Sequence, residues 1–167
     1  MEKQLMINVD RCNGCRMCEM ACSLTKEGEC STQCSRIKLV KTGEGIDVPI
    51  VCLQCKDPAC KSVCPVEAIT RDFSGTIIID QDLCIGCMKC MKACPVGAVS
   101  VDLRTRKMLK CDLCNGDPLC VKYCQPKAIE YVGKDHADFK EKMNEAERLL
   151  RSVRSQRKTA VLRAKPK

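Results

Sequence analysis

The chain has 167 residues, of which 18 are cysteine, four are aromatic and none is tryptophan. Cysteine above a tenth of all residues indicates a scaffold of disulfides, zinc or iron–sulfur clusters, and so few aromatic side chains argue against an ordinary apolar core. The formal net charge of +8 favours a nucleic-acid partner on its own, but the whole excess lies after Glu147, at Arg148, Arg151, Arg154, Arg157, Lys158, Arg163, Lys165 and Lys167.

The first ten residues, MEKQLMINVD, lack the apolar stretch of a secretion signal. The longest apolar runs, near Val48–Leu53 and Ile77–Ile79, are too short to cross a bilayer. We therefore expect a cytoplasmic protein with no membrane span. Because disulfides need an oxidising compartment, zinc and iron–sulfur clusters remain as the candidate scaffolds.

The predicted elements repeat along the chain as strand, cysteine loop, short helix and strand. Strands are predicted at Met6–Val9 and Thr76–Asp80, each before a cysteine loop, and at Arg36–Lys41. The fourth cysteine of a loop is expected to begin the short helix. After three of the loops a turn leads into a strand, at Val66–Thr70, Val96–Ser100 and Lys127–Tyr131.

Sixteen of the cysteines form four runs of four, and each run opens with Cys-x2-Cys. The runs are Cys12, Cys15, Cys18 and Cys22; Cys52, Cys55, Cys60 and Cys64; Cys84, Cys87, Cys90 and Cys94; and Cys111, Cys114, Cys120 and Cys124. The fourth cysteine always follows the third after three residues, and runs two and three end in Cys-Pro. This spacing is typical of ferredoxins.

A cube of four irons and four sulfides needs a thiolate at each iron, and Cys-x2-Cys-x2-Cys can direct three sulfurs at one cube. Zinc sites instead use separate cysteine pairs or histidine, and the only histidine here is His136. The runs therefore indicate four [4Fe–4S] clusters, which transfer single electrons. Since no GxGxxG, P-loop or Ser–His pair is present, we expect conduction rather than catalysis.

The charge balance changes once clusters are counted. Residues 1–147 carry as many acidic as basic side chains. Four oxidised clusters with four thiolates each would add a charge of about −8. The loaded protein would then be close to neutral, so we expect no nucleic-acid partner.

Residues 135–158 contain no cysteine, glycine or proline and are predicted to form an amphipathic helix. One apolar stripe runs along it, formed by Phe139, Met143, Ala146, Leu150 and Val153. Two interpretations stay open. The stripe packs on the body of its own chain, or the segment 139–153 clamps a partner subunit or a second copy of the chain.

The runs, with Cys22-Ser23-Leu24, Ser35-Arg36-Ile37 and Lys110-Cys111-Asp112-Leu113-Cys114, resemble the four-cluster ferredoxin-like subunits of molybdenum and tungsten oxidoreductases. The resemblance implies an α+β fold of two ferredoxin-like modules related by pseudo-twofold symmetry, plus the C-terminal helix. The expected domains are an outer module, 1–35 with 101–133, an inner module, 36–100, and a helical tail, 134–167.

The resemblance also implies how the cysteines are shared, because the fourth cysteine of each run crosses to a neighbouring cluster. The implied ligand sets are Cys12, Cys15, Cys18 and Cys124; Cys22, Cys111, Cys114 and Cys120; Cys52, Cys55, Cys60 and Cys94; and Cys64, Cys84, Cys87 and Cys90. No ligand position is missing, so all four clusters are expected to be [4Fe–4S].

The implied partners are a tungsten- or molybdenum-pterin catalytic subunit and an acceptor such as a flavin subunit that reduces NAD. The narrower expectation is the small subunit of a tungsten-containing aldehyde oxidoreductase. Alternatives are a polyferredoxin subunit of a formate dehydrogenase or hydrogenase, a freely diffusing polyferredoxin, and an iron–sulfur sensor that uses the basic tail.

Several chemically capable residues lie outside the runs or between ligands. Cys30 and Cys34 are expected to be free thiols or packing residues, with a redox or metal role as the alternative. His136 is expected to be a solvated surface residue. Four lysines adjoin ligands and either favour an added electron or are merely solvated: Lys56, Lys61, Lys89 and Lys92.

Overall fold

The computed structural model describes residues 3–42, 45–133, 135–136, 140–141 and 143–151. They form small antiparallel two-stranded sheets and short helices, which confirms the predicted α+β class. The strands are β1 (Lys3–Ile7), β2 (Lys38–Lys41), β3 (Asp47–Ile50), β4 (Ile69–Arg71), β5 (Ile77–Ile79), β6 (Ser100–Val101), β7 (Met108–Leu109) and β8 (Ile129–Gly133). The helices are η1 (Val9–Arg11), α1 (Met17–Glu27), α2 (Ala59–Ser62), α3 (Lys89–Ala93), η2 (Leu113–Gly116) and α4 (Leu119–Lys122).

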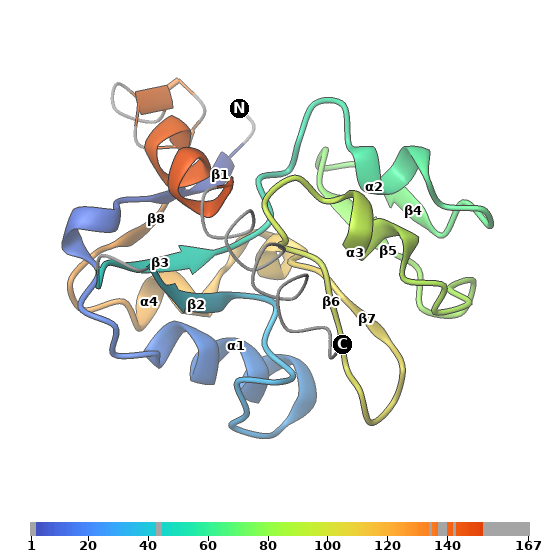
Figure 1. Cartoon of the computed structure of the whole chain (residues 1–167), viewed down its shortest axis with the longest axis horizontal. Coiled ribbons are helices and arrows are strands. Elements are labelled where there is room, and N and C mark those ends of the chain that lie inside the picture. The colour runs from blue at the N-terminus through green and yellow to red at the C-terminus, as the bar shows by residue number, and fades with distance from the viewer. Residues whose placement is uncertain (1–2, 43–44, 134, 137–139, 142, 152–167) are drawn as a thin grey trace, which may run out of the picture.

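The first and last strands of the described sheets pair with each other. β1 runs antiparallel to β8, from the pair Lys3 and Gly133 to the pair Ile7 and Ile129. Helix α1 packs on α4 beside this sheet. Figure 1 shows these elements together on one side of the molecule. The cysteine runs at the two ends of the sequence are therefore neighbours in space.

The middle of the sequence forms the other half of the molecule (Figure 1). β4 pairs with β5, and α2 packs on α3. The hairpin of β6 and β7 extends from the same side. Runs two and three are thus brought together as runs one and four are, which confirms the predicted pair of ferredoxin-like modules.

The strand predictions differ from the structure at β1 and β3, and β7 was not predicted either. β1 begins and ends earlier than the expected Met6–Val9, because Asn8 donates the last backbone hydrogen bond, to Ala128 at 2.8 Å, and Val9 then enters a 3-10 turn. Strand β3 was not predicted at all. It pairs with β2 and contacts η1, so this hairpin lies on the side of β1 and β8.

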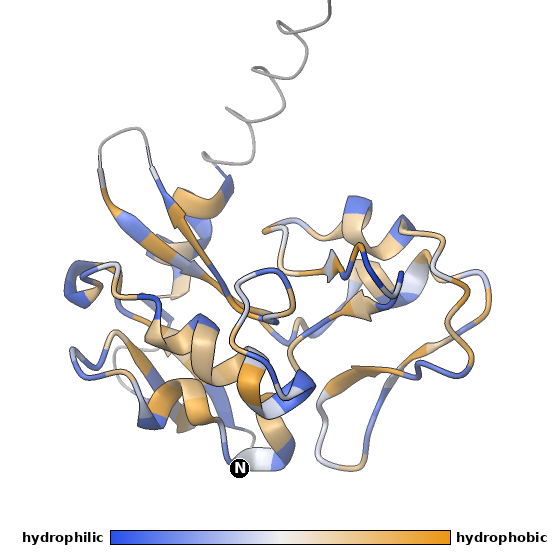
Figure 2. Cartoon of the chain, turned by 90° about the horizontal axis from the view of Figure 1, so that it is seen from below, coloured by the Kyte–Doolittle hydropathy of each residue, from blue (hydrophilic) through white to orange (hydrophobic). Residues whose placement is uncertain are grey.

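The core consists of aliphatic side chains and cysteines. Each of the four described sheets contributes side chains to this core, for example Ile7, Val48, Ile69, Met108 and Ile129. Figure 2 shows hydrophobic residues along the strands and hydrophilic residues in most turns. Of the described aromatic residues, Phe73 and Tyr123 are exposed and Tyr131 is only half-buried. The core of the described residues is therefore not built around aromatic side chains.

The C-terminal segment is helical at 140–141 and 143–151. Its residues Ala146 and Leu150 are 0% and 2% exposed and belong to the core cluster. This part of the predicted stripe therefore packs on its own chain. Phe139 and Val153 lie outside the described residues.

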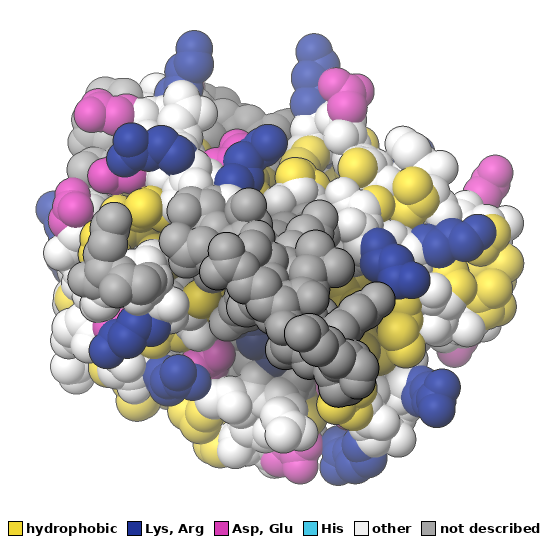
Figure 3. All heavy atoms as spheres, in the orientation of Figure 1, with side chains coloured by type: hydrophobic (Ala, Val, Ile, Leu, Met, Phe, Trp, Pro, Cys, Tyr) yellow, Lys and Arg dark blue, Asp and Glu magenta, His cyan; other side chains and the backbone are white. Residues whose placement is uncertain are grey.

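The described surface carries mixed charge. In Figure 3, Lys and Arg side chains are spread over the visible face among Asp and Glu, rather than gathered in one basic patch. None of the helices described is long and apolar enough to cross a membrane.

Candidate metal centres

Three open cavities in the structure are each lined by four cysteines. The cysteines that line them are Cys12, Cys15, Cys18 and Cys124 at site 1; Cys22, Cys111, Cys114 and Cys120 at site 2; and Cys64, Cys84, Cys87 and Cys90 at site 4. Each cavity combines three cysteines of one run with the last cysteine of another.

The remaining four cysteines of the runs meet at a further location, site 3. Burial raises the pKa of the Cys55 thiol, and the neighbouring charges of Cys52, Cys94 and Cys60 raise it further. The structure thus brings all sixteen cysteines together in the four crossed sets implied by the family resemblance. Their role as ligands remains a prediction.

In run one, helix α1 contains both the third and the fourth cysteine, Cys18 and Cys22. In the other three runs, the short helix carries the third cysteine and not the fourth. Cys60, Cys90 and Cys120 lie inside α2, α3 and α4, and the fourth cysteine follows at or just beyond the helix end. The expectation that the fourth cysteine begins the helix is therefore wrong. Since residues four apart share one helix face, the third and fourth cysteines can serve two adjacent sites from one turn of helix.

Left-handed backbone conformations shape the loops before the helices. In run one, Gly14 has φ +72° and Arg16 has φ +61°. In run three, Gly86 and Met88 repeat the pattern with φ +65° and +59°. At Gly14 the left-handed conformation favours glycine, and an added Cβ would lie 2.5 Å from Asp47 Oδ2, so that this carboxylate would have to shift.

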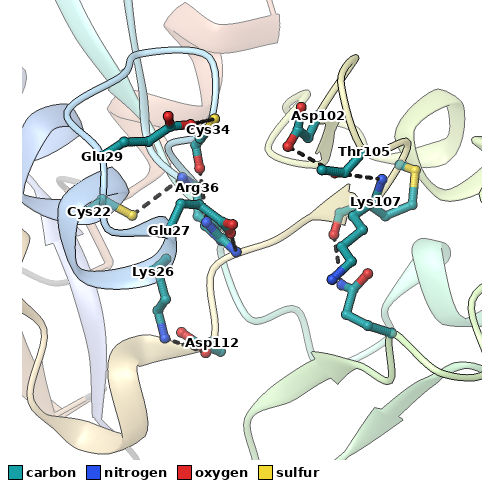
Figure 4. Close-up of polar contacts among 12 residues, drawn as sticks. Cys22, Lys26, Glu27, Glu29, Cys34, Arg36, Asp102, Thr105, Lys107 and Asp112 are labelled. Atoms are coloured by element: carbon teal, nitrogen blue, oxygen red, sulfur yellow. Dashed lines mark hydrogen bonds and ion pairs between the residues drawn. The ribbon is translucent and has the colours of Figure 1, made fainter.

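Backbone N–H groups donate hydrogen bonds to sulfurs at the proposed sites. Cys94 Sγ accepts from Ala98 N at 3.3 Å, and Cys124 Sγ accepts from Ala128 N at 3.2 Å. Cys22 Sγ accepts from Arg36 N at 3.3 Å (Figure 4). Such bonds favour the thiolate and tune a bound cluster. These donors were not predicted individually, although an alanine recurs four residues after the last cysteine of runs two, three and four.

Burial also determines the protonation of the free thiols. It raises the pKa of Cys18 and of Cys120 to about 12, and that of Cys90 to about 11. The pKa of the fully enclosed Cys111 is raised as well, chiefly by burial. Without metal these groups hold their protons at neutral pH, so only a strongly electrophilic group such as iron would convert them to thiolates.

The donor set fits iron–sulfur clusters. Within the described ranges, no group of three or more His, Cys, Asp or Glu is spaced to hold a single metal ion. The sulfurs instead surround cavities that are lined in part by apolar side chains. At site 2 these are Ile37, Val51 and Leu119, and the charged residues Lys26, Arg36 and Asp112 also line it. Four soft thiolates, three of them from one ferredoxin-type run, suit a cube of iron and sulfide.

The two extra cysteines differ from the ligand candidates and from each other. Cys30 is exposed, whereas Cys34 is buried and its thiol donates to Glu29 Oε1 at 3.1 Å (Figure 4). That hydrogen bond and burial raise the pKa of the Cys34 thiol. His136 is exposed to solvent. The four lysines near the candidate ligands are exposed as well, namely Lys56, Lys61, Lys89 and Lys92.

Comparison with protein families identifies the family to which the chain belongs. Residues 44–134 match the 4Fe-4S dicluster domain and residues 9–24 match a 4Fe-4S binding domain. The chain therefore belongs to the 4Fe-4S dicluster family and carries [4Fe–4S] clusters as predicted. Its 18 cysteines are consistent with four of them.

Individual relatives refine this class. The chain is 39% identical over 84 residues to the aliphatic sulfonate oxidoreductase, polyferredoxin-like subunit of Pyrococcus furiosus, covering 50% of this chain and 49% of the relative. It is 37% identical over 94 residues to the electron transport protein HydN of Escherichia coli K12, covering 52% and 53%. The chain thus spans about half the length of the curated relatives it matches. These relatives are a polyferredoxin-like subunit and an electron transport protein, the class of protein that the sequence predicts.

Among solved structures, the chain is similar to one in the active site complex BamBC of benzoyl coenzyme A reductase with 1,5-dienoyl-CoA. The identity is 24%, the TM-score is 0.46, and the match covers 90% of this chain and 89% of the other.

Proposed function

We propose that this chain is an electron-transfer subunit that conducts single electrons through four [4Fe–4S] clusters, held by the cysteines of sites 1 to 4. The observation that carries the proposal is the crossed grouping of the cysteines, since each site takes its last cysteine from another run. A bound cluster supplies one-electron redox chemistry. The chain supplies the thiolates, the N–H donors and the partly apolar walls.

Charge interactions between cysteines support a linear order of the sites. Cys120 of site 2 is influenced by Cys18 of site 1. Cys111 of site 2 is influenced by Cys52 of site 3. Cys90 of site 4 is in turn influenced by Cys60 of site 3. Neighbouring sites are thus close in the order 1, 2, 3 and 4, as a conducting path requires.

The two ends of this order reach the surface. Cys15 of site 1 and Cys87 of site 4 are the exposed members of the sixteen. Around site 4, exposed Leu83 and Ile85 flank Cys84. Hydrophobic side chains are also visible on the side of this half in Figure 3. Sites 1 and 4 are therefore the proposed points of electron entry and exit.

The proposed partner at one end is a tungsten- or molybdenum-pterin catalytic subunit, with an aldehyde oxidoreductase as the first candidate on the family resemblance. A sulfonate oxidoreductase is the second candidate, because the Pyrococcus relative has that name. The acceptor at the other end would be a flavin subunit that reduces NAD. A formate dehydrogenase or hydrogenase complex, or a free polyferredoxin, remains the alternative.

The module boundaries are part of the proposal. The outer module would comprise 1–35 and 101–133, the inner module 36–100, and the tail 134–167. The packing of β3 against η1 favours moving the β2–β3 hairpin to the outer module. Since Ala146 and Leu150 are buried in the chain's own core, contact with a partner or a second copy would use other parts of the tail.

A ligand variant at the end of the path tests the proposal. In the complex purified with its catalytic subunit, Cys87→Ser should abolish most electron transfer to the physiological acceptor. Turnover with an artificial dye that reaches the catalytic subunit directly should persist. Cys30→Ser, which alters an exposed cysteine outside the four sites, is the matched control and should change neither rate. Full physiological activity of a variant complex that has lost about four irons per chain would exclude site 4 from the path.

A further inference from the structure

Lys110 is a buried lysine at the joint between the two halves of the molecule. It follows β7 and immediately precedes Cys111, and only 7% of it is exposed. Figure 1 shows β7 leading from the inner half back toward the outer half. This burial contrasts with Lys56, Lys61, Lys89 and Lys92, which also adjoin cysteines but are exposed. A buried lysine is rare unless something compensates its charge.

The ammonium group of Lys110 contacts main-chain carbonyls only. Its Nζ donates to the carbonyl of Ile77 and, at 3.1 Å, to the carbonyl of Cys111. Among the described residues no carboxylate forms an ion pair with it. The two carbonyls satisfy two of its donors but leave its positive charge without an anionic side chain.

Lys110 lies beside residues of both central sites. Cys111, whose carbonyl it contacts, lines site 2. On the other side, the Cys111 carbonyl also accepts a hydrogen bond from Gln54, whose backbone N donates to Cys52 Sγ of site 3 at 3.5 Å. Gln54 links the same two segments as Lys110. Its Nε2 donates to the Cys111 carbonyl at 3.0 Å, and its Oε1 accepts from Ile77 N at 2.8 Å.

The electrostatic consequence follows from the cluster charge. A [4Fe–4S] core with four thiolates is a net anion, and each added electron makes it more negative. A cation buried beside it is little screened by water or salt and stabilises the form with the extra electron. Conversely, the anionic clusters provide the counter-charge that Lys110 lacks among side chains.

We propose that Lys110 raises the reduction potential of the clusters at sites 2 and 3 relative to those at the two ends. The inference depends on the proposed ligation of those sites. Each electron is taken from the neighbouring site and passed on, with no proton transferred and no bond formed or broken. Electrons that pass between the partners would therefore reside mainly on the clusters at sites 2 and 3.

The test is an anaerobic redox titration, followed by electron paramagnetic resonance, of the full-length loaded chain and four variants. Lys110→Met removes the charge at similar length, Lys110→Gln keeps a hydrogen-bond donor without charge, and Lys110→Arg keeps the charge. Lys56→Met, at an exposed lysine also next to a cysteine, is the matched control. Iron is counted in every sample first, so that loss of a cluster is separated from a shift in its potential.

The expected result is a fall in two of the four midpoint potentials in Lys110→Met and Lys110→Gln. The fall should correspond to at least about a tenfold change in the reduction equilibrium, or about 59 mV for one electron. Lys110→Arg and Lys56→Met should change every equilibrium less than about threefold. If Lys110→Met loses clusters, the midpoint potentials of Lys110→Gln are compared with those of the wild-type chain instead.

Two results would overturn the inference. One is a neutral variant with its full iron content and all midpoints unchanged. The other is Lys110→Arg shifting the midpoints as far as Lys110→Gln does, which would assign the effect to geometry rather than charge. A wild-type chain far below about sixteen irons would instead refute the proposed ligation.

Discussion

At the scale of single residues, buried polar groups that have hydrogen-bond partners help to position the segments that carry the cysteines. Glu19, next to Cys18 in α1, is 2% exposed. Its Oε1 accepts from Leu39 N at 3.0 Å, and its Oε2 accepts from Arg16 Nη1 at 3.3 Å. A single carboxylate thus joins the helix of run one to strand β2.

Glu19→Ala should leave the Leu39 N–H buried without a partner, at a loss of about 1–3 kcal/mol. Arg16→Ala removes only the half-exposed partner and should lose less than about 1 kcal/mol. The measurement is the guanidinium midpoint of anaerobic cluster loss, followed by visible absorbance. Equal midpoints for the two variants would show that the Glu19–Leu39 hydrogen bond contributes little.

The raised thiol pKa values predict how cluster retention depends on pH. A thiol whose pKa lies at about 11–12 binds a proton throughout the neutral range, so iron competes with protons at Cys18, Cys90 and Cys120. The competition weakens as pH rises toward those values. Iron retained per chain at a fixed chelator concentration should therefore increase from about pH 6 to about pH 9. Retention that is flat or falls over this range would contradict the proton competition.

At the scale of elements, each run is proposed to serve two sites, because its third and fourth cysteines lie four residues apart and belong to different sites. The C-terminal helix has a different role, since it covers the core without contributing a cysteine. Its buried residues Ala146 and Leu150 alternate with exposed ones such as Arg148. Its packing therefore depends on few apolar contacts.

Leu150→Ala should weaken the docking of the C-terminal helix by about 2–4 kcal/mol, because Leu150 is 2% exposed and would leave a cavity. The control Arg148→Ala changes an exposed side chain of the same helix and should have little effect. Limited proteolysis of the loaded chain gives the measurement. Leu150→Ala should be cleaved faster in its tail while its iron content stays unchanged. Equal cleavage of both variants would argue against docking.

At the scale of the whole molecule, the sequence was most informative where covalent spacing limits geometry. The intervals within the runs predicted the clusters, because three cysteines of one run can reach a single cube. The pairing of the modules was implied by the family resemblance, since each fourth cysteine comes from a run distant along the chain. The hairpin partner β3 was missed because its short segment contains Pro49 and lies among turn residues. The burial of Lys110 could not be predicted either, since a lysine in a charged, cysteine-rich stretch is usually exposed and only tertiary packing encloses it.

The central claim is that sixteen cysteines hold four cubes. The most direct measurement is the iron and acid-labile sulfide content of the anaerobically purified chain, determined against its protein concentration. The account predicts about sixteen irons and about sixteen sulfides per chain, with no stoichiometric zinc. A content of about four irons, or zinc in place of iron and sulfide, would contradict it.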